Sequence, residues 1–448
     1  MALFFILMVL NLILLSINGL LPINPGTQFA PSAIWRSPKG KGYFIHNTIH
    51  NPPFITHKPS FLSSSSSDDF ASPDDPNKYS SLSSSENLAL MSSLKSRISE
   101  IKASKRILTT AFLNGNFTST SYPLPTYVRR ISYANPHVLF GLFNGGVGIL
   151  DVQKNIITSF EETTRHAQYR DGFDEDKASP QLNAIHGDFD GGGVTAAQFG
   201  HDGKWAYTGG REGNVVVWNA TRGALTEQQV INLGPVVSNI LSGLDPEQRD
   251  VLLTACTDES GTLSVYKRLK PTLPYELSKI LELGNPVTSA AWSENEDGSK
   301  DYSRVWVGTS DGSLRQVGVD DLETGFEVKV SKSGVRAIAV TNDEEGNDVV
   351  YVGDSSGLMF YVAVGVVSPL TPPHREAVVS MALAGDNSVL LSGSRDGSVR
   401  VWDNKEGDGK YIIGPMKVWL SGVEVDGNIV VSDGADNMVV KHEFFKTD

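Results

Sequence analysis

The chain has 448 residues, a formal net charge of −13 and a single cysteine. This length allows one large domain with extensions, and one cysteine excludes a set of internal disulfides. The acidic balance argues against a general nucleic-acid-binding protein, which would carry a basic surface.

Residues 1–67 have the composition of a targeting leader. They contain no Asp or Glu, four basic residues and a Ser run. Because organelle transit peptides have this composition, we expect import into the chloroplast, and hence a plant source. Residues 3–17 are almost all apolar, as in a secretory signal, although no Lys or Arg precedes them. The alternatives are therefore the secretory pathway, or the cytoplasm or nucleus with a disordered leader. Contact with a membrane is expected only if this apolar stretch, too short to span a bilayer, is retained.

The next segments are a linker and a helix. Residues 68–85 are rich in Ser and Asp and are predicted to be disordered. Residues 86–105 are predicted to be helical, since Leu90, Leu94, Ile98 and Ile101 fall on one face. We expect this face to pack against the flank of the main domain; the alternative is a helix dedicated to a partner.

From residue 106 onward a strand–turn–strand unit recurs. The clearest copy covers residues 374–403 and contains Leu-Leu-Ser-Gly-Ser-Arg-Asp-Gly-Ser-Val-Arg-Val-Trp-Asp, and a second covers 194–219. Such a unit cannot bury its own faces, so the copies must stack, and the closed form of that stack is a β-propeller. The turn glycines predict seven blades: Gly145, Gly213, Gly261, Gly312, Gly357, Gly397 and Gly434. An acidic, Gly-rich insertion at 161–193 interrupts the first interval and is predicted to be a surface loop.

The two ends of the repeat region are predicted to share one blade. The last run, 438–445, ends three strands into its blade, so the fourth strand must come from before the first blade. We assign residues 106–112 to that outer strand, which would remove an open sheet edge.

The chain resembles the WD-repeat family, typified by the transducin β-subunit, over residues 105–448. In that family a His, a Ser or Thr, an Asp and a Trp of one blade form a buried hydrogen-bonded network, and His374, Ser392 or Ser394, Asp396 and Trp402 match it. Other blades depart from the pattern, with Glu212 in place of the Asp, Tyr266 in place of the Trp, and a Gly-Asn-Pro at 284–286. The resemblance implies an all-β, seven-bladed propeller in which this network is structural rather than catalytic.

Propellers of this family bind partners where the inner strands begin. A shared spacing places those starts at Val128, Val194, Val236, Val287, Val335, Val378 and Val418. The residues that follow them are Arg129, Thr195, Val237, Thr288, Arg336, Val379 and Trp419. Since the first and last blades adjoin, we expect a partner-binding patch of Tyr127, Arg129, Arg336, Lys417 and Trp419. Its residue types favour an acidic or phosphorylated segment of another protein; in the alternative interpretation Trp419 is core and the arginines are solvated.

The function predicted is a non-catalytic scaffold for protein partners, with no cofactor, no metal and no nucleic acid. His166, His186 and His201 lack regular metal-site spacing, and Cys256 is expected to be a buried, inert thiol. One alternative is a substrate receptor of a cullin-type ubiquitin ligase. Receptors of that class carry the motif Trp-Asp-x-Arg, whereas the nearest match here, Trp402-Asp403-Asn404-Lys405, ends in Lys. A plastid location would also exclude this role. The second alternative is a propeller hydrolase or lyase, which would place carboxylates around the channel, where the predicted mouth has none.

Overall fold

The computed structural model describes residues 84–161, 193–295, 299–343, 345–414, 420–433 and 437–445. The predicted leader, the linker up to residue 83 and nearly all of the 161–193 insertion therefore lie outside the described residues, whereas residues 84 and 85 of the predicted linker belong to a helix. No helix among the described residues combines the length and the apolar character needed to cross a bilayer.

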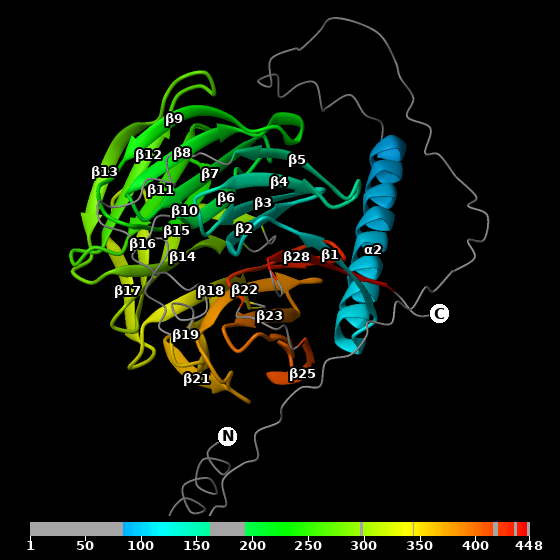
Figure 1. The fold of residues 1–448 in the computed structure, drawn as a ribbon. Helices are drawn as coiled ribbons and strands as arrows, with labels where there is room; N and C mark the ends of the chain where they lie inside the picture. The colour runs from blue at the N-terminus through cyan, green and yellow to red at the C-terminus, as the bar shows by residue number, and fades with distance from the viewer. Residues whose placement is uncertain are drawn as a thin grey trace, which may run out of the picture. The chain divides into compact units, whose positions relative to one another are not determined.

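The described chain forms seven four-stranded antiparallel sheets arranged as the blades of a propeller (Figure 1). The blades are numbered in chain order, and the strands of each are given from the inner strand outward. Blade 1 consists of β2 (Val128–Ala134), β3 (His137–Leu142), β4 (Val147–Asp151) and β5 (Ile156–Glu161). Blade 2 consists of β6 (Val194–Phe199), β7 (Trp205–Gly210), β8 (Asn214–Asn219) and β9 (Thr226–Asn232). Blade 3 consists of β10 (Val237–Leu244), β11 (Asp250–Cys256), β12 (Thr262–Arg268) and β13 (Glu276–Glu282). Blade 4 consists of β14 (Val287–Glu294), β15 (Lys300–Thr309), β16 (Ser313–Gly318) and β17 (Thr324–Lys329). Blade 5 consists of β18 (Val335–Asn342), β19 (Asp348–Asp354), β20 (Met359–Ala363) and β21 (Val366–Leu370). Blade 6 consists of β22 (Val378–Ala384), β23 (Val389–Ser394), β24 (Val399–Asp403) and β25 (Asp408–Ile413). Blade 7 consists of β26 (Val423–Asp426), β27 (Ile429–Ser432), β28 (Met438–Phe444) and β1 (Phe117–Pro123). A short 3-10 turn, η3 (Thr221–Gly223), joins β8 to β9. The seven-bladed prediction is confirmed.

Neighbouring blades interlock through a valine that starts an inner strand. A Cβ atom on Gly141 would lie 2.3 Å from Val194, and one on Gly353 would lie 2.5 Å from Val378. A side chain at either glycine would therefore prevent the next blade from packing. The turn glycines have a separate role: six of the seven predicted ones have φ between 63° and 92°, and Gly434 lies outside the described residues. A left-handed turn of this kind favours glycine.

The ring closes as predicted, but with a different strand. β1 pairs with β28 from Phe117↔Phe444 to Pro123↔Met438, so the two ends of the propeller share blade 7. The assignment of 106–112 to this strand was wrong, because those residues belong to helix α2 (Ser84–Asn114). Leu108, Ala111 and Phe112 recur at helical spacing, and their burial on one side of α2 stabilises the helix there.

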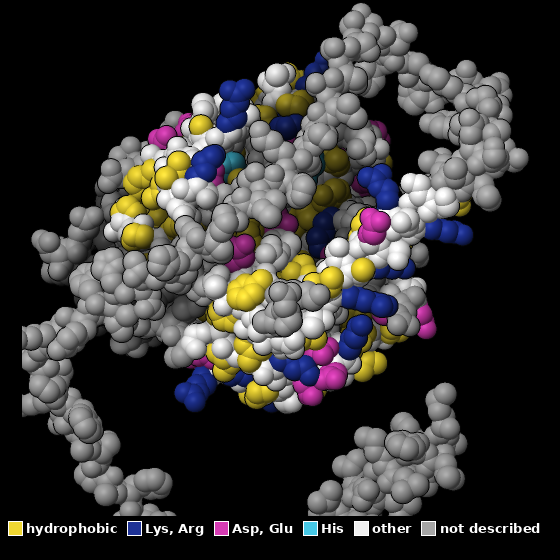
Figure 2. Space-filling view, turned by 90° about the vertical axis from the view of Figure 1, so that its right-hand side faces the viewer, with side chains coloured by type: hydrophobic (Ala, Val, Ile, Leu, Met, Phe, Trp, Pro, Cys, Tyr) yellow, Lys and Arg dark blue, Asp and Glu magenta, His cyan; other side chains and the backbone are white. Residues whose placement is uncertain are grey.

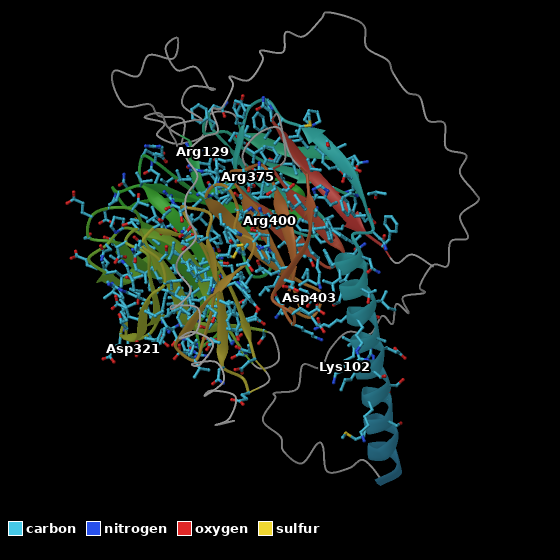
Figure 3. All side chains as sticks on the ribbon, turned by 90° about the horizontal axis from the view of Figure 1, so that it is seen from below. Lys102, Arg129, Asp321, Arg375, Arg400 and Asp403 are labelled. Atoms are coloured by element: carbon cyan, nitrogen blue, oxygen red, sulfur yellow. The ribbon has the colours of Figure 1, made fainter. Side chains whose placement is uncertain are left out.

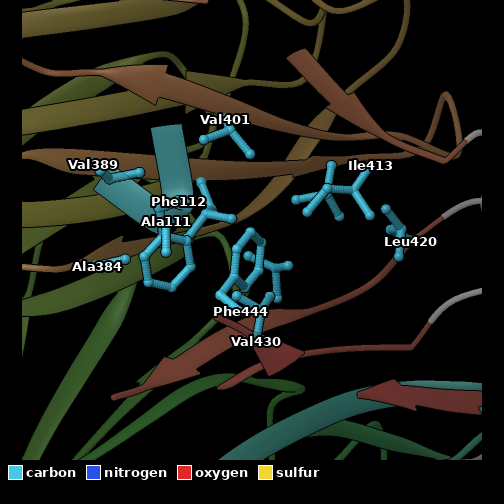
Figure 4. Packing of buried hydrophobic residues seen from close by; sticks show 12 residues of the cluster. Ala111, Phe112, Ala384, Val389, Val401, Ile413, Leu420, Val430 and Phe444 are labelled. Atoms are coloured by element: carbon cyan, nitrogen blue, oxygen red, sulfur yellow. The ribbon is translucent and has the colours of Figure 1, made fainter. Parts of the chain in front are cut away.

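Among the side chains of helix α2 that the structure describes, those packed on the propeller lie in its C-terminal part. Phe112 is fully buried, and its ring centroid lies 4.2 Å from that of Phe444, within a cluster that includes Ala384 and Val430 (Figure 4). Toward the N-terminus, Ile98 and Ile101 remain 52% and 57% exposed. The predicted packing of this apolar face against the propeller was therefore wrong for Ile98 and Ile101, and the side chains of Leu90 and Leu94 lie outside those described.

Candidate functional site at the mouth of the channel

Six of the inner strands share one irregularity near their first residue. In each, the pairing skips the residue that follows the leading valine, as between Val128 and Arg130 and between Val335 and Ala337. The skipped residues are Arg129, Thr195, Ser238, Thr288, Arg336 and Val379. A repeated bulge at the rim of each blade bends the strand and re-aims this residue, and such bulges are typical of functional edges.

Two of the predicted strand starts were displaced. The structure begins the third inner strand at Val237, not Val236, and the seventh at Val423, not Val418. Glu424, which follows Val423 in β26, pairs with Val431, and the predicted ring residue Trp419 lies outside the described residues. Burial raises the pKa of Glu424 to about 7.

Five arginines from four blades come together at this face. Arg129 and Arg130 lie on β2, Arg336 on β18, and Arg211 and Arg395 in the turns that follow β7 and β23. Burial, together with Arg130, Arg211 and Arg395, lowers the pKa of Arg129 to about 9. Burial and then Arg336 lower the pKa of Arg130 to about 10, with Arg395 adding to the effect. Since Arg130 on blade 1 is influenced by Arg336 on blade 5, the group spans the channel mouth. We call these five residues the arginine cluster.

Short contacts hold parts of the cluster in place. The Arg130 Nη1 group donates to the Arg129 carbonyl at 2.8 Å, and the Arg129 guanidinium lies 5.8 Å from the ring centroid of Phe143. The Arg395 backbone N–H donates to the Ala377 carbonyl at 2.9 Å, which anchors its turn to the strand entry of the same blade. The cluster therefore has a partly fixed backbone and guanidinium geometry.

The carboxylate of Asp433 counters part of the cluster. Asp433 raises the pKa of Arg130, against the effect of the neighbouring arginines. Asp433 itself accepts hydrogen bonds from the backbone N–H groups of Ser421 and Gly422, at 2.8 Å and 2.9 Å. Burial nevertheless raises the pKa of Asp433 to about 6. The arginines lower one another's pKa, so a carboxylate or phosphate group that entered the mouth would favour their charged forms.

The structure brings together some of the predicted patch. Arg129 and Arg336 belong to the cluster, and Tyr127 adjoins it, its carbonyl accepting from the Phe143 N–H at 2.9 Å. Lys417 and Trp419 lie outside the described residues. Sequence reasoning missed Arg130, Arg211 and Arg395. A signal existed for the last two, since Gly-Gly-Arg-Glu-Gly and Gly-Ser-Arg-Asp-Gly place an arginine in the same turn of two repeats.

The four residues of the predicted blade network form one hydrogen-bonded chain. The Trp402 Nε1–H donates to Ser392 Oγ at 2.8 Å, and Ser392 Oγ lies 2.8 Å from His374 Nε2. His374 Nδ1 lies 3.1 Å from Asp396 Oδ2. Ser392 is 0% exposed, so no substrate can reach its hydroxyl, and burial lowers the pKa of His374. The order of groups is that of a catalytic triad, but its burial favours a structural role.

Two further expectations concern reactive groups. Cys256 is buried, and burial raises the pKa of its thiol to about 12, so it is an inert thiol as predicted. Within the part of the chain that the structure describes, no group of three or more His, Cys, Asp or Glu side chains is placed to hold a metal ion. His166 and His186 lie outside that part.

Comparison with known proteins places two segments in a described repeat family. Residues 181–219 and 368–403 match the model of the WD domain, G-beta repeat. A kinesin-like protein KIF21A from Homo sapiens is 23% identical over 220 residues, which are 45% of this chain and 13% of that protein. A pre-mRNA-processing factor 19 homolog 2 from Arabidopsis thaliana is 25% identical over 203 residues, 45% of this chain and 30% of that protein. The chain thus matches less than a third of the length of either relative.

The matched segments coincide with structural repeats. The first ends with β8 and the second spans β22 to β24, each of which is part of a four-stranded blade. The other blades repeat the same strand order, and six of the inner strands share the same bulge. The chain therefore carries WD repeats within a seven-bladed β-propeller.

Proposed function

We propose that this protein is a non-catalytic interaction scaffold whose arginine cluster binds an acidic or phosphorylated segment of a partner protein. WD-repeat propellers typically bind other proteins and are generally non-catalytic. The observation that carries the finer proposal is the convergence of five arginines from four blades on one face of an acidic protein. A net charge of −13 would repel an acidic partner elsewhere, so this cluster gives such a partner a preferred approach.

The chemistry of arginine suits this role. A guanidinium group presents a planar fork that pairs bidentately with carboxylate or phosphate, and it stays protonated even when its pKa is lowered. The partly buried position of Arg129 and Arg130 reduces screening by water and salt. Arg336 is exposed and can be reached from solvent. The cluster thus combines an accessible cation with more deeply placed ones, which favours an extended acidic segment over a single small anion.

Binding of defined peptides tests the proposal. A fluorescein-labelled acidic peptide and a phosphoserine peptide should bind the full chain, and a lysine-rich peptide should not. The double variant Arg336→Glu/Arg395→Glu should weaken binding by about tenfold or more, because each change removes an attractive charge and adds a repulsive one. Affinity should also fall as salt is raised across the physiological range.

The matched control is Arg222→Glu. Arg222 is exposed and lies in η3, at the other end of the strands from the arginine cluster, so the same charge change there should leave affinity unchanged. If Arg222→Glu weakens binding as much as the double variant does, the effect is one of net charge, and the proposed site is wrong. Full affinity in the double variant would also reject it.

A further inference from the structure

Helix α2 has a long N-terminal part that leaves apolar side chains in water. Met91, Ile98 and Ile101 are 55%, 52% and 57% exposed, and the described residues from 91 to 107 are all exposed. Contact with the propeller begins only near Leu108. Figure 3 shows Lys102 on the part of the helix that extends beyond the blades. An isolated helix of this length gains little stability in water, since most helices depend on packing of an apolar face.

The sequence of α2 has the spacing of a coiled-coil repeat. Met91, Ile98, Lys105 and Phe112 recur every seven residues, and Leu94, Ile101 and Leu108 fill the alternate position of the same repeat. This spacing is the a and d pattern of a helix that packs along another helix. The last members of the seam, Leu108 and Phe112, already pack on the propeller. The exposed seam is thus continuous with an established interface, and a helix lying along it would end against the propeller.

The charges beside the seam are strongly biased. Residues 91–107 contain five basic side chains and one acidic side chain, Glu100. Lys95, Arg97 and Lys102 occupy the e and g positions that flank the seam, and Lys105 lies within it. Figure 2 shows Lys and Arg side chains on the face of the molecule that carries α2. Flanking charges of this kind determine which helix can pair and in which register.

This bias disfavours a second copy of the same helix. Pairing of two α2 helices would set Arg97 of one copy against basic residues of the other, and like charges at these positions repel. A partner helix with acidic flanking residues would instead form ion pairs along both sides of the seam. A lipid surface fits less well, because the seam is narrow, the other positions are rich in Ser, and residues 91–107 contain no aromatic residue.

We propose that residues 91–108 of α2 form one half of a two-helix coiled coil with a partner protein that supplies an acidic amphipathic helix. This site is separate from the arginine cluster and does not depend on the function proposed for it. The scaffold would then have two binding sites of different kinds: a channel mouth for an acidic extended segment, and a helix for an acidic helical one.

A synthetic probe tests the pairing on the full chain. The probe is a peptide of about three heptads with Ile at a, Leu at d and Glu at e and g; its control carries Lys in place of Glu. Fluorescence anisotropy should show binding of the Glu peptide and little or none of the Lys peptide. The variant Ile98→Asp/Ile101→Asp should weaken binding by about tenfold or more, whereas the control variant Ser93→Asp/Ser99→Asp, with the same charge change off the seam, should retain it.

Several results would overturn the proposal. Equal binding of both peptides, or equal loss in both variants, would show that seam and charge do not determine pairing. Analytical ultracentrifugation could show that the chain forms a homodimer and that only the Ile98→Asp/Ile101→Asp variant is monomeric. That result would mean that the seam binds a second copy of the chain. The chain could also float with vesicles that contain anionic lipid, and only that variant could fail to do so. That result would mean that the seam binds a membrane. The variant Arg336→Glu/Arg395→Glu should still bind the Glu peptide, because the changed residues lie outside α2. This result would separate the test of the helix from the test of the arginine cluster.

Discussion

Replacing Phe112 with Ala should destabilise the propeller, although Phe112 belongs to a helix outside the blades. The Phe112 side chain is fully buried and packs with Ala384, Val389 and Phe444, which come from the last two blades. Truncation of a buried Phe to Ala typically costs about 3–5 kcal/mol, from lost transfer free energy and from the cavity left behind. We expect about 3 kcal/mol, because the end of α2 can partly relax into the space.

The assay is urea denaturation at neutral pH, followed by tryptophan fluorescence. The midpoint should fall in Phe112→Ala while the m-value is unchanged, since the surface exposed on unfolding stays similar. Ile101→Ala is the matched control on the same helix: its side chain is 57% exposed, and the change should cost less than about 0.5 kcal/mol. A loss below about 1 kcal/mol for Phe112→Ala would refute the reasoning that the end of α2 is part of the propeller core.

Three further predictions follow from the structure and the leader. Burial lowers the pKa of His442 to about 4 in the folded protein, whereas its pKa in the unfolded chain is about 6.5. As the pH falls, the unfolded state is therefore protonated at His442 before the folded state is. Stability should therefore fall between about pH 6.5 and 4, and His442→Gln should make that fall shallower in urea titrations at several pH values. His374→Ala should destabilise by roughly 1–3 kcal/mol, because Ser392 and Asp396 lose a buried partner; an unchanged urea midpoint would contradict the structural role. Residues 1–67 fused to a fluorescent protein should direct it to plastids, and entry into the secretory pathway would instead support the signal-peptide alternative.

The sequence was sufficient to predict the architecture because the repeat carries its own register. The turn glycines mark the same point of each blade, and six of the seven have the left-handed backbone that requires glycine. Ring closure also followed from counting strands. The closing strand was misassigned because residues 106–112 are apolar enough for either structure, whereas the true strand, Phe117–Pro123, is mostly exposed and polar. An outer edge strand gives a weak hydrophobic signal.

The binding site was only partly predictable. Arg129 and Arg336 follow from the spacing of the inner strands, because each occupies the same bulge in its blade. Arg211 and Arg395 come from turns, and their approach to Arg129 depends on how the blades are arranged around the ring. The strand start at Val423 was missed because the seventh inner strand, Val423–Asp426, is short and pairs without the bulge. Such a strand gives too little pattern to fix its register.

The most direct measurement of the central claim is the position at which a bound acidic peptide contacts the protein. A peptide that carries a photo-reactive group should be bound to the full chain, irradiated, and mapped by mass spectrometry. The arginine cluster predicts cross-links to the segments around Arg129, Arg211, Arg336 and Arg395. Cross-links concentrated at the opposite ends of the strands, around Arg222, would contradict it.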